Sequence, residues 1–221
     1  MKHTILGLFG LTAGLAQAAI LVSPVTVTND TGFVEFFALN NIINGSGLSA
    51  TPDFSNYTTI THGIAGAGTA WTTDAPNGGT GDYFDPGGTG ITLTLTLDLG
   101  GTFELSDFVY WGYHFGAPNG NEVREFSLEF STDGGGSYGA PVVVSSALGD
   151  HTVAAARTLS LGGTFTADTV RATFTDNHFG VGQPAGGDRA GLGELRFVAV
   201  PEPSTVLLGG LALLGLARRK R

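Results

Sequence analysis

The sequence predicts an all-β domain, a sandwich or a barrel, in the middle of the chain. The chain contains 36 glycines among 221 residues, and outside its two ends almost no segment follows an uninterrupted helical period. Several segments alternate apolar and polar side chains, which is the pattern of strands with one buried face. Short strands joined by glycine-rich turns are typical of sandwiches and barrels. The composition, 42% hydrophobic and 13% charged, excludes a disordered chain.

The first 19 residues predict a secretory signal peptide. Lys2 supplies a positive charge, Ile5 to Leu15 is an apolar run too short to span a bilayer, and Ala16-Gln17-Ala18 fits the small-residue rule for cleavage. We therefore expect signal peptidase to cut near residue 19 and the protein to be exported. The alternative is a buried N-terminal helix.

The clearest strand runs from Ile91 to Leu99, where apolar residues alternate with threonines and one aspartate. A period of two places the apolar side chains on one buried face. The threonines on the other face are good exposed strand residues, although they could also form a binding ladder.

Further strands are predicted along the rest of the middle segment. Phe108 to Tyr113 reads as a mostly buried aromatic strand, and Val123 to Phe130 alternates again. The remaining predicted strands are Pro141 to Ser145, Thr169 to Thr175 and Leu192 to Val200. No repeat of about 20–50 residues is visible, so the sequence does not predict a propeller or a solenoid.

The segment Ser131 to Tyr138 resembles the Asp-box, a hairpin turn seen in sialidase propellers and in other β proteins. Within it Asp133 can accept hydrogen bonds from turn amides, and the glycines that follow allow positive φ. Because the motif occurs once, we interpret it as a structural turn.

The C-terminal segment, residues 200–221, predicts a short membrane anchor. Pro201, Glu202 and Pro203 end the last strand, because proline cannot donate to a ladder. The apolar run from Thr205 to Ala217 must be helical to enter lipid. At about 1.5 Å per residue it covers roughly 20 Å, less than the roughly 30 Å hydrocarbon core. The chain ends in four basic residues that stay cytoplasmic. They are Arg218, Arg219, Lys220 and Arg221.

The Pro-Glu-Pro motif, the short helix and the basic tail together resemble the PEP-CTERM protein-sorting domain. The resemblance implies that the tail holds the protein at the inner membrane until an exosortase, a membrane transpeptidase, processes it. It further implies display at the cell surface or release, typically in bacteria that secrete exopolysaccharide. The alternative is an ordinary tail-anchor helix.

Between these ends, residues 20–199 form one domain of strong negative charge. The segment holds five arginines, no lysine and eighteen acidic residues, a net charge of −13, whereas the whole chain carries −9. Nucleic acid is excluded as a partner, because binding duplex phosphate requires cations. Acidic surfaces can attract Ca²⁺. The chain has no cysteine, so disulfides and zinc–thiolate sites are excluded.

The middle domain as a whole resembles the discoidin-like, galactose-binding jelly roll, which is a β-sandwich. The residues that carry the resemblance are weak one by one and are recognisable by their order along the chain. They are Asn44-Gly45, Trp71, Asp98-Leu99-Gly100, an aromatic strand around Trp111, and the blocks 126–134 and 187–197. The ligand loops match no sugar-binding subfamily.

The resemblance also implies one structural Ca²⁺ between an early loop and an acid near the last strand. Asn44 matches the early loop and Glu194 matches the late acid. Family members often carry Asp in place of Asn44, so this chain offers less negative charge there. The alternative is that Glu194 pairs with Arg189 or Arg196.

A carbohydrate site would combine a planar apolar platform with polar groups. Two glycine-rich loops, 115–121 and 179–187, could frame a ligand if both lie at one rim. The candidate ligand-binding residues are Trp111, Tyr113, His114, Asn119, Asn177 and His178. The alternative is core packing for Trp111 and turn chemistry for the asparagines.

The sequence does not predict an enzyme. It contains neither a Gly-x-Ser-x-Gly elbow nor a His-Glu-x-x-His motif. We expect a non-catalytic cell-surface or matrix protein that binds exopolysaccharide. The first alternative is a structural biofilm component without a discrete ligand, and a polysaccharide hydrolase is the least favoured.

Overall fold

The structure is a computed structural model, and it describes residues 18–76, 79, 81–85, 90–147, 154–180 and 186–201. Within it, residues Ala19–Val200 form a compact unit. The apolar cores of the predicted signal peptide and of the predicted C-terminal anchor lie outside the described residues. In the part of the chain that is described, no helix has the length and apolar character needed to cross a bilayer.

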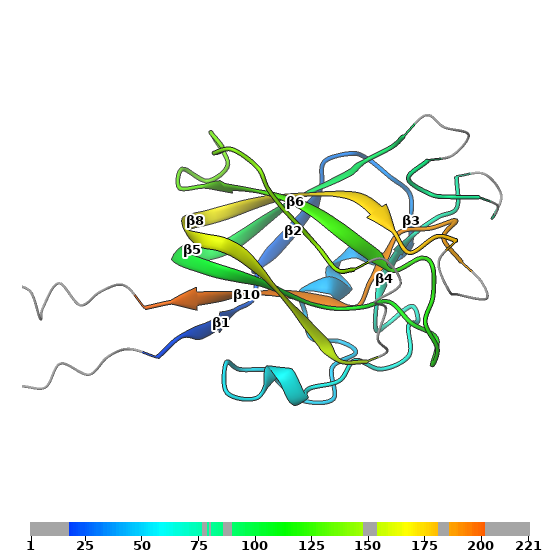
Figure 1. Cartoon of the computed structure of the whole chain (residues 1–221), viewed down its shortest axis with the longest axis horizontal. Coiled ribbons are helices and arrows are strands. Elements are labelled where there is room, and N and C mark those ends of the chain that lie inside the picture. Colours follow the sequence, from blue (N-terminus) through cyan, green and yellow to red (C-terminus); the bar gives the residue numbers. More distant parts are fainter. Residues whose placement is uncertain are drawn as a thin grey trace, which may run out of the picture. The chain divides into compact units, whose positions relative to one another are not determined.

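Within its described residues the unit consists of ten strands and two short 3₁₀ helices. Figure 1 shows this mainly β architecture, in line with the predicted class. The strands are β1 (Ile20–Val22), β2 (Thr26–Asn29), β3 (Glu35–Phe37), β4 (Trp71–Thr73), β5 (Leu93–Trp111), β6 (Val123–Ser131), β7 (Val142–Ser145), β8 (Ala156–Asn177), β9 (Gly191–Leu192) and β10 (Glu194–Val200). The helices are η1 (Leu39–Ile42) and η2 (Tyr57–Thr59).

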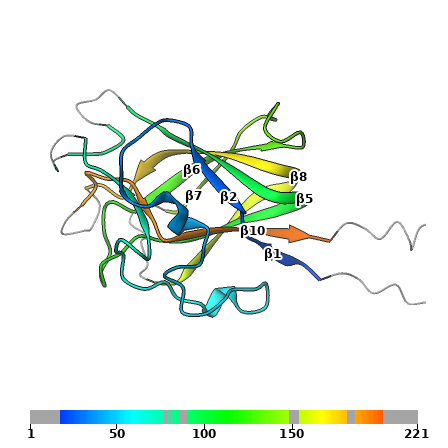
Figure 2. The same cartoon turned by 180° about the vertical axis from the view of Figure 1, so that it is seen from behind.

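The large sheet runs in the order β1-β10-β5-β8-β6-β7, with β2 also paired to β5. A second sheet has the order β3-β4-β9. All these pairs are antiparallel, and β2 and β10 both pair with β5 (Figure 2). The first half of β5 pairs with β2, and its second half pairs with β10. One long strand therefore serves two separate sets of neighbours.

The ladder between β5 and β8 changes register at two bulges. On β5 the residues Leu99–Thr102 stand opposite one residue of β8, and on β8 the residues Leu161–Thr164 stand opposite one residue of β5. Both bulges have the sequence Leu-Gly-Gly-Thr, and the first glycine of each, Gly100 and Gly162, has φ of +74°. A residue with a Cβ avoids that conformation, so the glycines permit the bulges and the bend that accompanies them.

A cluster of aromatic side chains forms part of the core on the large sheet. The Phe126 ring on β6 lies 4.8 Å from the Phe108 ring, 5.0 Å from Tyr110 and 5.3 Å from Phe174, measured between ring centroids. All four side chains are fully buried. Because β8 carries Phe174 and β5 carries Phe108 and Tyr110, this cluster connects three strands of the large sheet.

The predicted strands are confirmed, with differences in extent. Residues 93–99 of the alternating segment and 108–111 of the aromatic segment belong to one strand, β5 (Leu93–Trp111). The segment 169–175 lies within β8, which runs from Ala156 to Asn177. Leu93, Leu95, Leu97 and Leu99 are buried, as the alternation predicts. The last predicted strand is divided into β9 and β10 by Gly193.

The turn after β6 has the structural role expected of it. The Asp133 carboxylate accepts hydrogen bonds from the Ser137 amide at 2.9 Å, from the Ser137 hydroxyl at 2.7 Å and from the Ser131 hydroxyl at 2.6 Å. These donors lower the pKa of Asp133 to about 2. The charged carboxylate thus organises the turn.

Replacing Asp133 with Asn should lower the thermal midpoint at neutral pH by a few degrees, because the neutral amide accepts these hydrogen bonds less well. The folded pKa, about 2, lies below the unfolded value near 4, so the charged carboxylate stabilises above pH 4 and this stabilisation is lost as the pH falls toward 2. Melts of wild type and D133N should therefore converge over that window. In the described part of the chain the Glu104 carboxylate makes no hydrogen bond, so E104Q is the control. A midpoint gap that stays constant from pH 7 to pH 2 would contradict the assignment.

Candidate functional site

The two glycine-rich loops singled out in the sequence meet at one rim of the domain. The Gly191 amide donates to the Asn121 carbonyl at 2.7 Å, and the Asn177 side chain donates to the Gly187 carbonyl at 3.0 Å. The His178 amide donates to the Gly120 carbonyl at 3.2 Å. The Gly187 amide also donates to the Asn121 side-chain oxygen, which joins the described residues of both loops where β5 and β8 end and β6 begins.

Trp111 lies in the interior and is fully buried. Its indole Nε1 donates to the Ile60 carbonyl at 2.9 Å, and its ring packs with Val109 and Val198. The segment around residues 48–60 covers this face of β5 and β10. Trp111 therefore has the core-packing role that the sequence analysis gave as its alternative. A solvent-facing apolar platform for a sugar would have to come from other side chains.

Tyr113 and His114 are also buried, and they position the loop that follows them. The Tyr113 ring meets the Phe115 ring edge-on at 5.2 Å, and burial raises the pKa of Tyr113 to about 12. The His114 Nε2 lies 3.1 Å from the His62 carbonyl, while its Nδ1 accepts a hydrogen bond from the Gly116 amide at 3.1 Å. His114 therefore connects the loop to residue 62 and carries no exposed nitrogen for a ligand.

Asn177 and His178 are buried beneath the rim. The Asn177 amide donates to the carbonyls of Gly187 and Arg189 and accepts from the Phe179 amide at 2.9 Å. Asn119 is half-buried, and its Oδ1 accepts from the Asn121 amide at 2.9 Å. Of the six candidate residues, Asn119 is the one with appreciable exposure, and a direct ligand contact by any of them stays a prediction.

Exposed aromatic side chains that the sequence analysis did not select as candidates lie on the two glycine-rich loops and on β3. Phe36 is 56% exposed, Phe115 is 51% exposed and Phe179 is 40% exposed. Arg189 lies over the Phe36 ring at 4.3 Å, and Phe37 beside Phe36 packs against the cluster that contains Tyr113. We use "the rim" for Phe36, Phe115, Asn119, Phe179, Asp188 and Arg189. For Phe115 and Phe179, a large apolar residue inside a glycine-rich loop is the sequence signal that could have identified them.

A buried polar network lies below the rim. Arg157 donates to the Tyr110 hydroxyl at 2.7 Å and pairs with the Glu122 carboxylate. His178 Nε2 lies 3.8 Å from Glu122 Oε1 and 3.5 Å from Ser146 Oγ. Serine and acid thus approach the same ring nitrogen, whereas a nucleophilic relay needs them on opposite nitrogens. We interpret this network as a fully enclosed support for the rim.

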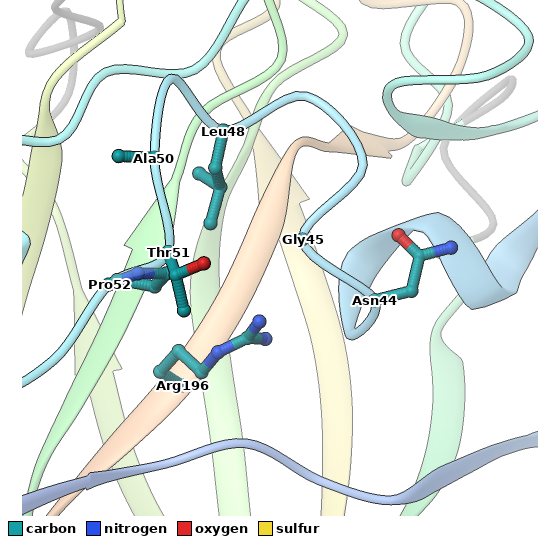
Figure 3. A pocket seen from close by; sticks show the side chains of 7 residues that line it. All are labelled: Asn44, Gly45, Leu48, Ala50, Thr51, Pro52 and Arg196. Atoms are coloured by element: carbon teal, nitrogen blue, oxygen red, sulfur yellow. The ribbon is translucent and has the colours of Figure 1, made fainter.

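A pocket of about 330 Å³ lies beside β10 (Figure 3). It is lined by Asn44, Gly45, Leu48, Ala50, Thr51, Pro52 and Arg196. Figure 3 shows the Arg196 guanidinium directed from the strand toward the chain at Gly45, while the Asn44 side chain points away from it.

The predicted calcium ligands lie close together in the chain's fold, but their contacts fit a Ca²⁺ ion poorly. Glu194 is fully buried, its Oε2 accepts from the Gly45 amide at 2.9 Å, and its Oε1 is engaged by Arg196. Asn44 Oδ1 accepts from the Ser46 amide at 2.8 Å. Ca²⁺ requires six to eight oxygens, and among the described residues no group of three or more His, Asp or Glu converges. Burial raises the pKa of Glu194 to about 7, against the attraction of Arg196.

Comparison with protein families identifies the end of the chain. Residues 199–221 match the family described as the PEP-CTERM protein-sorting motif, which confirms the resemblance noted in the sequence. The motif indicates an exported protein that is anchored transiently at a membrane, and it implies processing by an exosortase. No curated protein matches the chain.

Three solved structures are similar to this chain. A CBM32 module from Clostridium perfringens, in complex with GalNAc-β-1,3-galactose, is 20% identical with a TM-score of 0.44, over 81% of this chain and 92% of that chain. The family 32 CBM of C. perfringens NanJ, in complex with galactose, is 12% identical with a TM-score of 0.44, over 81% and 98%. C. perfringens ZmpB, with two CBM32 domains and an M60 catalytic domain, is 14% identical with a TM-score of 0.50.

The ZmpB match covers 81% of this chain but only 15% of that longer protein. With a TM-score of 0.50 at 14% identity, this match shows the fold alone, a jelly-roll β-sandwich as predicted.

Replacing Asn177 with Ala should lower the free energy of unfolding by about 1–3 kcal/mol, because two carbonyls and one amide of the rim lose a buried partner. Denaturant unfolding measures this change. Asn40 is exposed and its side chain makes no hydrogen bond within the described residues, so N40A is the matched control. Equal stabilities of N177A and N40A would show that Asn177 does not hold the loops.

Proposed function

We propose that the domain is an exported, non-catalytic carbohydrate-binding protein whose ligand contacts the rim. The observation that carries the proposal is the meeting of the two loops, which leaves the rings of Phe115 and Phe179 exposed beside the half-buried polar residues Asn119 and Asp188. Aromatic faces beside hydrogen-bonding groups match the apolar faces and hydroxyls of a sugar.

The charge of the domain narrows the ligand class. With a net charge of −13 over residues 20–199, the domain repels polyanions at long range and is suited to neutral sugars. Arg189, held over Phe36, is the one described cation of the rim and can donate to ring or hydroxyl oxygens. Galactose and N-acetylgalactosamine, which occur in complexes of proteins with this fold, are the first sugars to test.

The sorting motif supports the location that we propose for this binding. After exosortase processing, the protein would reside at the cell surface or in the extracellular matrix and bind the exopolysaccharide of the cell that secretes it. The motif supports the export route, and the exposed residues of the rim support the proposed contact with the sugar. A structural matrix component without a discrete ligand is the reading that remains if no sugar binds.

The test is titration calorimetry of the full chain in detergent with galactose, N-acetylgalactosamine and purified neutral exopolysaccharide. Binding should weaken by roughly tenfold in F115A, since losing one ring–sugar contact costs about 1–1.5 kcal/mol. Phe54 is 42% exposed and lies beside Tyr57, outside the rim, so F54A is the matched control and should bind as wild type does.

A glycan array that shows no binding to any neutral or acidic glycan would favour the structural matrix component. Binding that F54A weakens as much as F115A would move the ligand away from the rim. Turnover of a polysaccharide by the purified chain would contradict the non-catalytic assignment.

A further inference from the structure

The Glu194 carboxylate connects the last strand of the domain to an early loop 149 residues away in sequence. It is the first residue of β10 and is fully buried. One oxygen accepts the Gly45 amide, and the other faces the Arg196 guanidinium. A buried carboxylate must be neutralised or paired, because leaving it alone in the interior costs several kcal/mol. The way in which the loop at Gly45 is held against β10 therefore depends on the cation that pairs with Glu194.

Arg196 is built into the same junction. It is 6% exposed, and its Nη1 donates to the Leu195 carbonyl at 2.7 Å as well as to Glu194. Its Nη2 would lie 3.9 Å from a Cβ placed on Gly45, so the guanidinium occupies the space between loop and strand. It lines the pocket together with Leu48, Ala50, Thr51 and Pro52 (Figure 3).

The hydrogen-bonding partners of the Glu194 carboxylate among the described residues are donors, whereas a calcium ion would need acceptors. The Gly45 amide points its hydrogen at the carboxylate, and the Asn44 oxygen is directed to the Ser46 amide. A cation placed beside Glu194 would meet an N–H group and a guanidinium, both of which repel it. The donor set thus suits a fixed organic cation and does not suit a metal.

We propose that Arg196 is the built-in cation of this junction, taking the place that a structural metal ion would have, so that the domain folds without Ca²⁺. A guanidinium is always charged and is covalently attached, so neither chelation nor dilution can remove it. The clip between residue 45 and β10 is then a permanent part of the fold.

Thermal melts of the full chain, in detergent, test the metal side of the proposal. The midpoint should be the same, within about 1 °C, in EDTA and in millimolar CaCl₂, because a ligand that binds only the folded state would raise it. A midpoint that falls in EDTA and recovers with Ca²⁺ would overturn the proposal.

A double-variant cycle tests the arginine side. R196M should lower the midpoint by about 10 °C, since it leaves a buried carboxylate without its cation. Adding E194Q to R196M should recover at least half of that loss, because the charge that needed compensation is gone. Equal midpoints for R196M and wild type, or no recovery in the double variant, would overturn the proposal.

R196K and R171M complete the design. R196K keeps the charge and should lose less than R196M, and it remains informative if R196M does not fold. Arg171 pairs with Glu129 at 2.7 Å but is 37% exposed, so R171M removes an Arg–Glu ion pair from the surface. Its midpoint should fall by a few degrees at most. A loss in R171M as large as that in R196M would show that burial of the junction does not matter.

Discussion

The antiparallel ladder between β5 and β8 is the constraint on which the rest of the domain depends. Both strands bend at Leu-Gly-Gly-Thr bulges, and each half of the ladder then receives different neighbours. The ends of these two strands set where the rim loops start, and the second half of β5 fixes β10 beside it. The positions of the rim loops and of β10 therefore follow from the pairing of β5 with β8.

Local alternation predicted much of this architecture and could not predict the rest for a physical reason. A period of two identifies a strand with one buried face, as in Leu93 to Leu99 and in β6. It cannot show that β10 is buried on both faces, because the cover over Arg196 and Val198 comes from a distant loop. Nor did it show that β5 and β8 continue through their glycine pairs, although the repeated sequence Leu-Gly-Gly-Thr-Phe was a visible signal.

The candidate site illustrates the same limit. The sequence singled out two loops that do meet in the fold, because glycine-rich segments after strands mark where a rim can form. It selected the residues at the strand ends, such as Tyr113 and His178, and the fold uses these as buried supports. The exposed rings of Phe115 and Phe179 lie one or two residues further along. Which of two neighbouring residues is buried depends on tertiary packing, which the sequence pattern does not show.

The pairing of β1 with β10 has a mechanical consequence. β10 runs from Glu194, beside Trp111, to Val200; β5 pairs with it along its length on one side, and β1 pairs with Phe197–Ala199 on the other. A pull applied at Val200 and resisted at the loops beyond Glu194 would act along this strand, perpendicular to its ladder bonds. The bonds would share such a load in shear instead of opening in sequence, which is the stronger geometry for a tethered domain under flow.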